Sequence, residues 1–299
     1  MSFSTLSKCC SCVLIYDKYL LILIITILFG SAYPVQKVIF NENVPPLLMG
    51  SLRMLVVFIC LIPFWKFKIP NKKYWLPLFC FSISMGFLAN VFMTLSLNEA
   101  GIVSPIIIGS QLAIPFAILL SSFFLNETVS IKKWILIFIS FFGIILLGFD
   151  PLIRNEIFAL ILISFMAFFY ASAQVFSRYL KDLEVTLTNA VMGLIGFIFL
   201  IISSFIFEGE TLKQIKNISL QSWLLILHSG IFVSIGAHMS MFYLYRIYPV
   251  NRVFPFYALF PVFGVLLTFM IFYEIPTLIT LIGGFIVIVA TYLINKEKN

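Results

Sequence analysis

Residues 97–127 read LNEAGIVSPIIIGSQLAIPFAILLSSFFLNE, and residues 244–274 read LYRIYPVNRVFPFYALFPVFGVLLTFMIFYE. The two stretches align without a gap and share the pairs Leu97/Leu244, Val103/Val250, Leu112/Leu259, Phe116/Phe263, Leu119/Leu266, Leu120/Leu267 and Glu127/Glu274. Each is an apolar helix that contains proline and ends in glutamate, and Pro115 lies one position from the residue aligned with Pro261. A repeat at about half the chain length, with helix-breaking residues at matching depth, is typical of carriers built from two related halves.

The composition places the chain in a membrane. Of its 299 residues 62% are hydrophobic and only 10% are charged, and the mean hydropathy is +1.12. Soluble proteins carry about 25% charged residues. At about 20 residues per span, the length accommodates roughly ten helices and leaves little for a soluble domain.

The net charge of +7 does not indicate a nucleic-acid partner, because the basic residues lie in small groups between apolar runs, as in cytoplasmic loops. Of five cysteines, Cys9, Cys10 and Cys12 lie in the amino-terminal tail and Cys60 and Cys80 in apolar runs. None forms a metal-binding pattern with histidine, so we expect reduced thiols, no metal and no cofactor.

Ten apolar segments predict an all-α integral membrane protein with ten transmembrane helices, arranged as two inverted five-helix repeats around a central cavity. The segments are residues 19–40, 46–65, 75–97, 103–125, 131–149, 157–179, 187–207, 222–245, 253–273 and 277–295. They are apolar all round, as spans are, and no segment of about ten residues alternates in polarity as a β-barrel strand would.

The basic residues also predict the orientation. With the amino terminus in the cytoplasm, fourteen Lys and Arg fall on the inner side and four on the outer side: Lys37, Arg154, Lys213 and Lys216. Both termini are then cytoplasmic. Since five spans per half is an odd number, the second half enters the membrane upside down, and Glu127 faces the cytoplasm while Glu274 faces outside.

The repeat sets the expected domain boundaries: a cytoplasmic tail (1–18), a first repeat (19–149), a linker (150–156), a second repeat (157–295) and a second tail (296–299). Two fainter matches occur in the same order. FGSAYPVQ at 29–36 aligns with FYASAQVF at 169–176, and PLLMGSLRMLVVF at 46–58 aligns with LTNAVMGLIGFIF at 187–199.

Polar side chains at membrane depth are costly unless they face a cavity or one another. They are concentrated in the first, third, fourth, sixth, eighth and ninth segments, which we expect to surround a polar cavity while the others face lipid. The candidate substrate-binding residues are Tyr33, Asn90, Gln111, Tyr170, Gln174, His238 and Tyr257. For each one, an interhelical hydrogen bond is the alternative role. His238 also offers a ring that titrates near neutral pH, which makes a proton one candidate coupling ion.

Prolines inside spans free a backbone carbonyl, so Pro115 and Pro261 are candidate hinges, with a static kink as the alternative. We assign structural roles to Arg53, Glu127 and Glu274. For Arg53 three interactions stay open: snorkelling to the surface, pairing with a carbonyl, or holding an anionic substrate.

These features resemble EamA-type proteins of the drug/metabolite transporter superfamily. The similarity rests on FGS at 29–31, on Arg53, and on a proline-containing helix that ends in glutamate before a glycine-bearing helix, at Pro115, Leu125, Glu127 and Gly143 and again at Pro261, Phe272, Glu274 and Gly283. The resemblance covers about residues 15–295. It implies two inverted five-helix repeats, a cavity lined by helices 1, 3, 4, 6, 8 and 9, and alternating access without ATP.

The sequence thus predicts a secondary transporter, not an enzyme, which moves an amino-acid-like or nucleoside-like metabolite across the inner membrane of a bacterium as a monomer or homodimer. The alternatives are an uptake permease for a host metabolite such as S-adenosylmethionine, an exporter of drugs or toxic compounds, and a non-transporting membrane scaffold. An intramembrane enzyme would need a metal or an acid/base cluster, and no such pattern is visible.

Labelling from outside the cell tests the inverted topology. After removal of the native cysteines, a cysteine at Glu127 should be shielded from a membrane-impermeant thiol reagent in intact cells, whereas one at Glu274 should be labelled. Labelling of both from the same side would contradict the two inverted halves.

Overall fold

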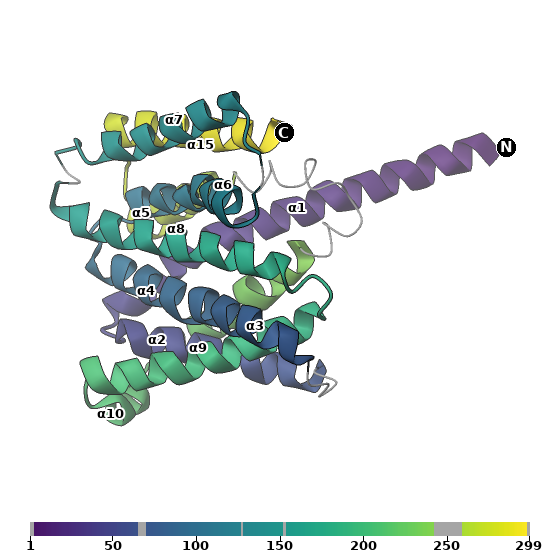
Figure 1. The fold of residues 1–299 in the computed structure, drawn as a ribbon. Coiled ribbons are helices and arrows are strands. Elements are labelled where there is room, and N and C mark those ends of the chain that lie inside the picture. Colours follow the sequence, from purple (N-terminus) through teal and green to yellow (C-terminus); the bar gives the residue numbers. More distant parts are fainter. Residues whose placement is uncertain (1–2, 65–69, 127, 152–153, 242–258, 298–299) are drawn as a thin grey trace.

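A computed structural model describes residues 3–64, 70–126, 128–151, 154–241 and 259–297. Within these ranges every regular element is helical. The helices form a stacked bundle, and Figure 1 shows the amino-terminal part of α1 extending away from it. The all-helical class predicted from the sequence is confirmed.

The helical elements follow the predicted apolar segments closely. In chain order they are α1 (Phe3–Asn41), α2 (Pro46–Leu61), η1 (Ile62–Phe64), η2 (Lys72–Tyr74), α3 (Trp75–Ser82), η3 (Ile83–Leu88), α4 (Ala89–Glu99), α5 (Ser104–Gly109), η4 (Ser110–Leu112), α6 (Ala113–Phe124), α7 (Ile131–Leu147), η5 (Arg154–Glu156), α8 (Ile157–Arg178), α9 (Val185–Phe207), α10 (Thr211–Asn217), α11 (Leu220–Leu227), η6 (His228–Ala237), α14 (Phe260–Phe272) and α15 (Leu278–Lys296).

Seven helical segments in the described ranges are long and apolar enough to cross a membrane: 20–41, 46–64, 72–99, 104–124, 154–178, 185–207 and 220–241. The apolar helices Phe260–Phe272 and Leu278–Ile294 are shorter. The first part of the expected ninth span, 253–258, lies outside the described residues, and α7 has 17 residues. Ten spans therefore remain a prediction, whereas a multi-pass membrane protein is established.

The packing follows the two-fold pattern of an inverted repeat. α1 packs against α14, and the equivalent pair α8 and α6 also pack together; α2 packs against α9, and α7 against α15. Figure 1 shows α7 and α15 side by side at one edge of the bundle and α2 and α9 together near the other. Each of these pairs is therefore matched by its counterpart when the helices of the first repeat are exchanged for the equivalent helices of the second.

Glycines bring the backbones into contact at two helix crossings, α1 with α14 and η3 with α9. A Cβ added to Gly30 of α1 would lie 2.7 Å from the Gly264 nitrogen in α14, and one added to Gly86 of η3 would lie 3.3 Å from the Gly196 Cα in α9. Small residues permit such close approach in lipid, where no hydrophobic driving force brings helices together. Packing is thus the role of these glycines.

We call a membrane-crossing stack of consecutive helical elements a rod and number the rods by their predicted spans. Three rods are not continuous α-helices: the third (α3, η3 and α4, residues 75–99), the fourth (α5, η4 and α6, residues 104–124) and the eighth (α11, η6 and the turn that follows, residues 220–241). The third and eighth contain wide π-helical turns, Ile83–Leu88 and His228–Ala237. Because residue 97 aligns with residue 244, the first of these aligns with residues 230–235, inside the second. The fourth rod narrows to a 3-10 turn at Ser110–Leu112, immediately before α6. Matching irregularities in both halves are a structural counterpart of the sequence repeat.

Carboxylates from distant connections satisfy the free backbone N–H groups at several helix starts. Glu274, which follows α14, accepts hydrogen bonds from the N–H groups of Val103 and Ser104 at 2.8 and 2.9 Å, where α5 begins without a side-chain cap. Helix starts favour negative charge because their N–H groups have no partner within the helix. Glu274 therefore joins the two halves of the protein.

Glu208, after α9, plays the same part for α2. It accepts from Leu47 N and Leu48 N at 2.6 and 2.9 Å and from the Ser204 hydroxyl at 2.7 Å. Burial raises the pKa of the Glu208 carboxyl in spite of these three bonds. The carboxylate is thus held where water reaches it poorly.

Three further acids act at the same end of the bundle. Glu42 accepts from the hydroxyls of Ser219 and Ser222, and these bonds lower the pKa of its carboxyl. Glu156 accepts from Gly101 N at 2.8 Å, and Asp150 accepts from Thr277 and Thr280. We call these five acids, Glu42, Asp150, Glu156, Glu208 and Glu274, the carboxylate face. All of them lie in or beside connections that the charge bias predicts to be extracellular.

Replacing Glu274 with alanine tests this capping role. Glu274→Ala leaves two backbone donors without a partner and should lower the free energy of unfolding by roughly 1–3 kcal/mol. The matched control is Glu210→Ala, because the side chain of Glu210 is 71% exposed and pairs only with Lys213, three residues along the same helix start. Thermal unfolding in detergent measures both, and equal losses would contradict the role of Glu274.

Candidate functional site

A cavity of about 70 Å³ lies where α1, α2, the third and eighth rods, α8 and α14 meet. Its lining is mostly aromatic and sulfur-containing, with a few polar groups: Phe29, Ala32, Tyr33, Arg53, Met85, Ala89, Asn90, Met93, Met166, Tyr170, Val233, His238 and Phe260. Both repeats contribute to it. We call this space the central cavity.

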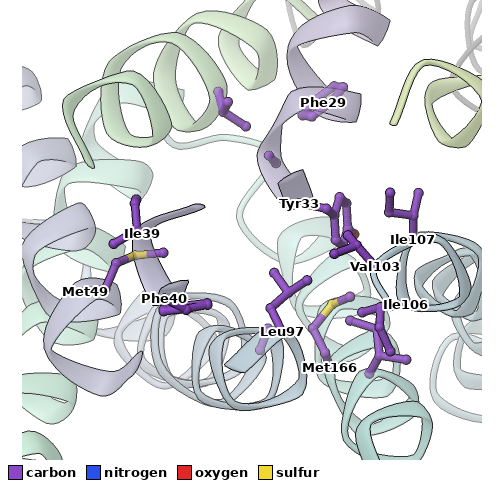
Figure 2. Packing of buried hydrophobic residues seen from close by; sticks show 14 of the residues in the cluster. Phe29, Tyr33, Ile39, Phe40, Met49, Leu97, Val103, Ile106, Ile107 and Met166 are labelled. Atoms are coloured by element: carbon purple, nitrogen blue, oxygen red, sulfur yellow. The ribbon is translucent and has the colours of Figure 1, made fainter. Parts of the chain in front are cut away.

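Four of the predicted binding residues line the central cavity: Tyr33, Asn90, Tyr170 and His238. Figure 2 shows Tyr33 in the buried core with Val103, Ile107 and Met166 nearby. The Tyr33 ring also stacks on Phe260, with ring centroids 6.1 Å apart. Side chains from four separate rods thus reach one space.

The other three predicted residues are placed differently. Gln111 is 1% exposed in η4, and no described residue forms a hydrogen bond with either amide atom, but it does not line the central cavity. Gln174 is half-buried on α8, four residues beyond Tyr170, and is not part of the lining either. Tyr257 lies outside the described residues. The structure therefore does not bring all seven together.

The π-helical turn before Asn90 sets the position of its amide. The Nδ2 group donates to the carbonyl of Met85 at 2.8 Å and to that of Gly86 at 3.2 Å, which lie five and four residues earlier. The Oδ1 atom is buried and has no hydrogen-bond partner among the described residues. Asn90, which lines the cavity, thus offers its Oδ1 as a hydrogen-bond acceptor for a ligand.

His238 occupies a similar place after the second π-helical turn. Its Nδ1 lies 3.1 Å from the carbonyl oxygen of Val233, five residues earlier. A carbonyl only accepts, so Nδ1 carries a hydrogen, and in the neutral ring Nε2 holds a lone pair. Nε2 is buried and has no partner in the part of the chain that the structure describes, and the Phe29 ring meets the imidazole edge-to-face with ring centroids 4.7 Å apart. His238 therefore offers a second acceptor.

Arg53 also lines the central cavity, although we expected helix 2 to face lipid and assigned Arg53 a structural role. It is 7% exposed, and its Nε donates to the Ser234 hydroxyl at 2.9 Å. One sequence signal pointed to this residue, since it is the only charge well inside a span of the first half and such charges are expensive. The sequence did not reveal that Ser234, 181 residues away, would orient it.

The candidate hinges lie at helix starts. Pro115 is the third residue of α6, directly after the 3-10 turn, and Pro261 is the second residue of α14. A proline in the first turn removes an N–H that has no helical partner anyway. Of the two repeat glutamates, Glu274 caps α5, and Glu127 lies outside the described residues.

Two larger grooves, of about 440 and 560 Å³, run along α8. Their walls are almost wholly apolar and include exposed rings such as Phe124 and Phe165. A membrane protein exposes such surfaces to lipid tails. The central cavity is smaller, but it combines polar and aromatic groups in the way binding sites do.

Comparison with known proteins agrees with this architecture. One solved crystal structure is similar over 92% of this chain and 94% of its own, with a TM-score of 0.63 and 17% sequence identity, a likeness that shows the fold. A search of curated proteins found no match. The model of the EamA-like transporter family matches residues 18–149 and again residues 157–296. The chain therefore belongs to the EamA-like transporter family and is a membrane transporter of the drug/metabolite transporter superfamily.

Proposed function

We propose that this protein is a secondary transporter that moves a small metabolite, amino-acid-like or nucleoside-like, by alternating access through the central cavity. The bacterial inner membrane is its proposed location, with both termini in the cytoplasm. The observation that carries the proposal is a lining with uncommitted polar atoms, Asn90 Oδ1 and His238 Nε2, among aromatic rings from both repeats. Buried polar atoms normally have partners, and a ligand would provide them.

The lining favours some substrates over others. Tyr33, Tyr170, Phe29 and Phe260 offer flat apolar surfaces for a ring or an aliphatic chain, and none of the lining residues is acidic. A strongly basic cation would need an acidic partner. A zwitterion or a heterocycle does not.

The small volume of the central cavity indicates which conformation of the transporter the structure represents. About 70 Å³ is less than the several hundred Å³ of pockets that hold drug-sized ligands. Three methionines in the lining, Met85, Met93 and Met166, have flexible side chains that can make room. We infer that the structure represents a form closed around the site, which widens when substrate enters.

Alternating access fits the inverted halves. The carboxylate face ties together connections from both repeats, so this end of the bundle is closed, and opening it would require the caps at Val103, Ser104, Leu47 and Leu48 to separate. Uptake of a host metabolite such as S-adenosylmethionine and export of toxic compounds use the same cycle in opposite directions. Flux measurements in both directions distinguish them.

Alanine variants of the cavity test the proposed site. Tyr33→Ala, Asn90→Ala, Tyr170→Ala and His238→Ala should each weaken substrate binding about ten- to a hundredfold, since one good polar contact contributes roughly 1–3 kcal/mol. The control is Phe199→Ala on α9, a residue that is 38% exposed and does not line the central cavity. Uptake into proteoliposomes from a panel of amino acids and nucleoside metabolites provides the measurement.

Two outcomes of that experiment would change the proposal. If all four variants transport like Phe199→Ala, the central cavity is not the binding site. If a proton is coupled through His238, His238→Ala should also flatten the pH dependence of uptake between about pH 5.5 and 7.5; an equal loss at every pH leaves His238 as a binding residue only.

The hinge proposal predicts a kinetic effect. Pro115→Ala and Pro261→Ala remove the fixed φ of proline at the starts of α6 and α14. If these helix starts are hinges, both variants should slow turnover more than they weaken binding. The maximal uptake rate and the equilibrium affinity separate the two effects. Wild-type rates in both variants would leave only a static kink.

A further inference from the structure

Arg53 is a buried cation at the wall of the central cavity. It lies in the first half of α2 (Pro46–Leu61), is 7% exposed and belongs to the cavity lining. A charged group taken out of water is strongly destabilising unless an opposite charge compensates it. The first question is therefore which group neutralises Arg53.

None of the acids whose side chains the structure describes forms an ion pair with Arg53. Ten of the twelve acidic residues of the chain are described, the others being Asp17 and Glu127, and all ten lie at helix ends or in connections: Glu42, Glu99, Asp150, Glu156, Asp182, Glu184, Glu208, Glu210, Glu274 and Glu297. Five of them form the carboxylate face. Arg53 forms no ion pair with any of these ten.

The contacts that Arg53 does make orient it without neutralising it. Nε donates to the Ser234 hydroxyl at 2.9 Å, which in turn donates to the Ser229 carbonyl at 2.9 Å, and Nη1 lies 4.0 Å from the Met93 sulfur. A hydroxyl and a thioether are neutral, and the thioether is a weak acceptor. The guanidinium is thus oriented by neutral groups and keeps a charge that an anionic ligand would neutralise.

The neighbouring polar atoms have the complementary character. Asn90 Oδ1 and His238 Nε2 are acceptors that no described residue satisfies, and both residues line the same cavity as Arg53. A fixed cation beside two uncommitted acceptors matches a molecule that carries an acid group close to a hydrogen-bond donor.

We propose that Arg53 is the anion-binding residue of the central cavity, and that the substrate is an organic acid whose carboxylate or phosphate pairs with its guanidinium while a donor on the same molecule meets Asn90 and His238. This inference rests on the proposed transport function and specifies its substrate class. The planar guanidinium binds such oxyanions through two parallel hydrogen bonds, which a lysine does not reproduce. Ser234 is a positioning residue for it.

The first test needs no ligand. An uncompensated buried charge opposes folding, so in ligand-free protein Arg53→Met should raise the unfolding temperature by about 2–4 °C. Lys213→Met, which removes an exposed charge with 70% side-chain exposure, should leave it unchanged. A fall in the unfolding temperature of Arg53→Met would show that Arg53 is a structural residue and would overturn the inference.

The second test uses matched compounds on the purified full-length protein. Thermal stabilisation and Kd are measured for tyrosine, tyrosinamide, 3-(4-hydroxyphenyl)propionate and tyramine, and for adenosine and adenosine monophosphate. At least one acid should bind wild-type protein about ten- to a hundredfold more tightly than its uncharged or amide counterpart. The first four compounds report a carboxylate, and the last two a phosphate.

Variants then show whether the preference for acids over amides depends on Arg53. Arg53→Met should abolish the difference between acid and amide, Arg53→Lys should retain part of it, and Lys213→Met should keep all of it. A preference that persists in Arg53→Met would overturn the inference, as would the absence of any acid preference in the wild type. Uptake of neutral metabolites into proteoliposomes would still support transport in that case, so the two failures are distinguishable.

Discussion

The structure depends on one constraint, which is that a backbone polar group in a bilayer must find its partner inside the protein. A continuous helix meets this requirement along its length but leaves its first N–H groups free. Here the helix starts at α2 and α5 lack a side-chain cap of their own, and Glu208 and Glu274 supply one from the opposite repeat. The same bonds that satisfy the helix starts therefore hold the two halves together at one end.

The interior polar groups follow from the same constraint. Ser96 donates to the Ala159 carbonyl at 2.7 Å, and Lys37 donates to the Leu97 carbonyl at 3.1 Å, so both serve interhelical contacts and not the cavity. Asn90 and His238 differ, because in each side chain one nitrogen donates a hydrogen bond to a carbonyl of its own rod, and the other polar atom has no partner among the described residues. Whether a buried polar side chain has an unpartnered atom therefore distinguishes candidate substrate-binding residues from residues that hold helices together, and does so more clearly than depth in the membrane.

Much of the fold could be read from the sequence because lipid imposes simple rules. The apolar runs predicted the helices, and predicted segment 46–65 appears as helix over 46–64. Polarity at membrane depth selected Tyr33, Asn90, Tyr170 and His238, which do share a cavity. It also selected Gln111, which packs elsewhere, since composition does not fix which way a helix is rotated. The role of Glu208 was not predictable, because its amide partners are 160 and 161 residues away in the chain. For Arg53 the sequence left three interactions open, and none of them anticipated its hydrogen bond to the Ser234 hydroxyl, which the packing of α2 against η6 brings about.

The π-helical turns in the third and eighth rods determine which residues those rods present. Each holds an extra residue relative to an α-helix, and one residue corresponds to a rotation of about 100° about the helix axis. If either turn were rewound as a regular α-helix, the residues beyond it would revolve by that amount, and Asn90 or His238 would leave the cavity wall. The helical winding of two short segments, Ile83–Leu88 and His228–Ala237, therefore determines which side chains line the cavity. Deleting one residue from either would re-aim the site while leaving the composition of the helix almost unchanged.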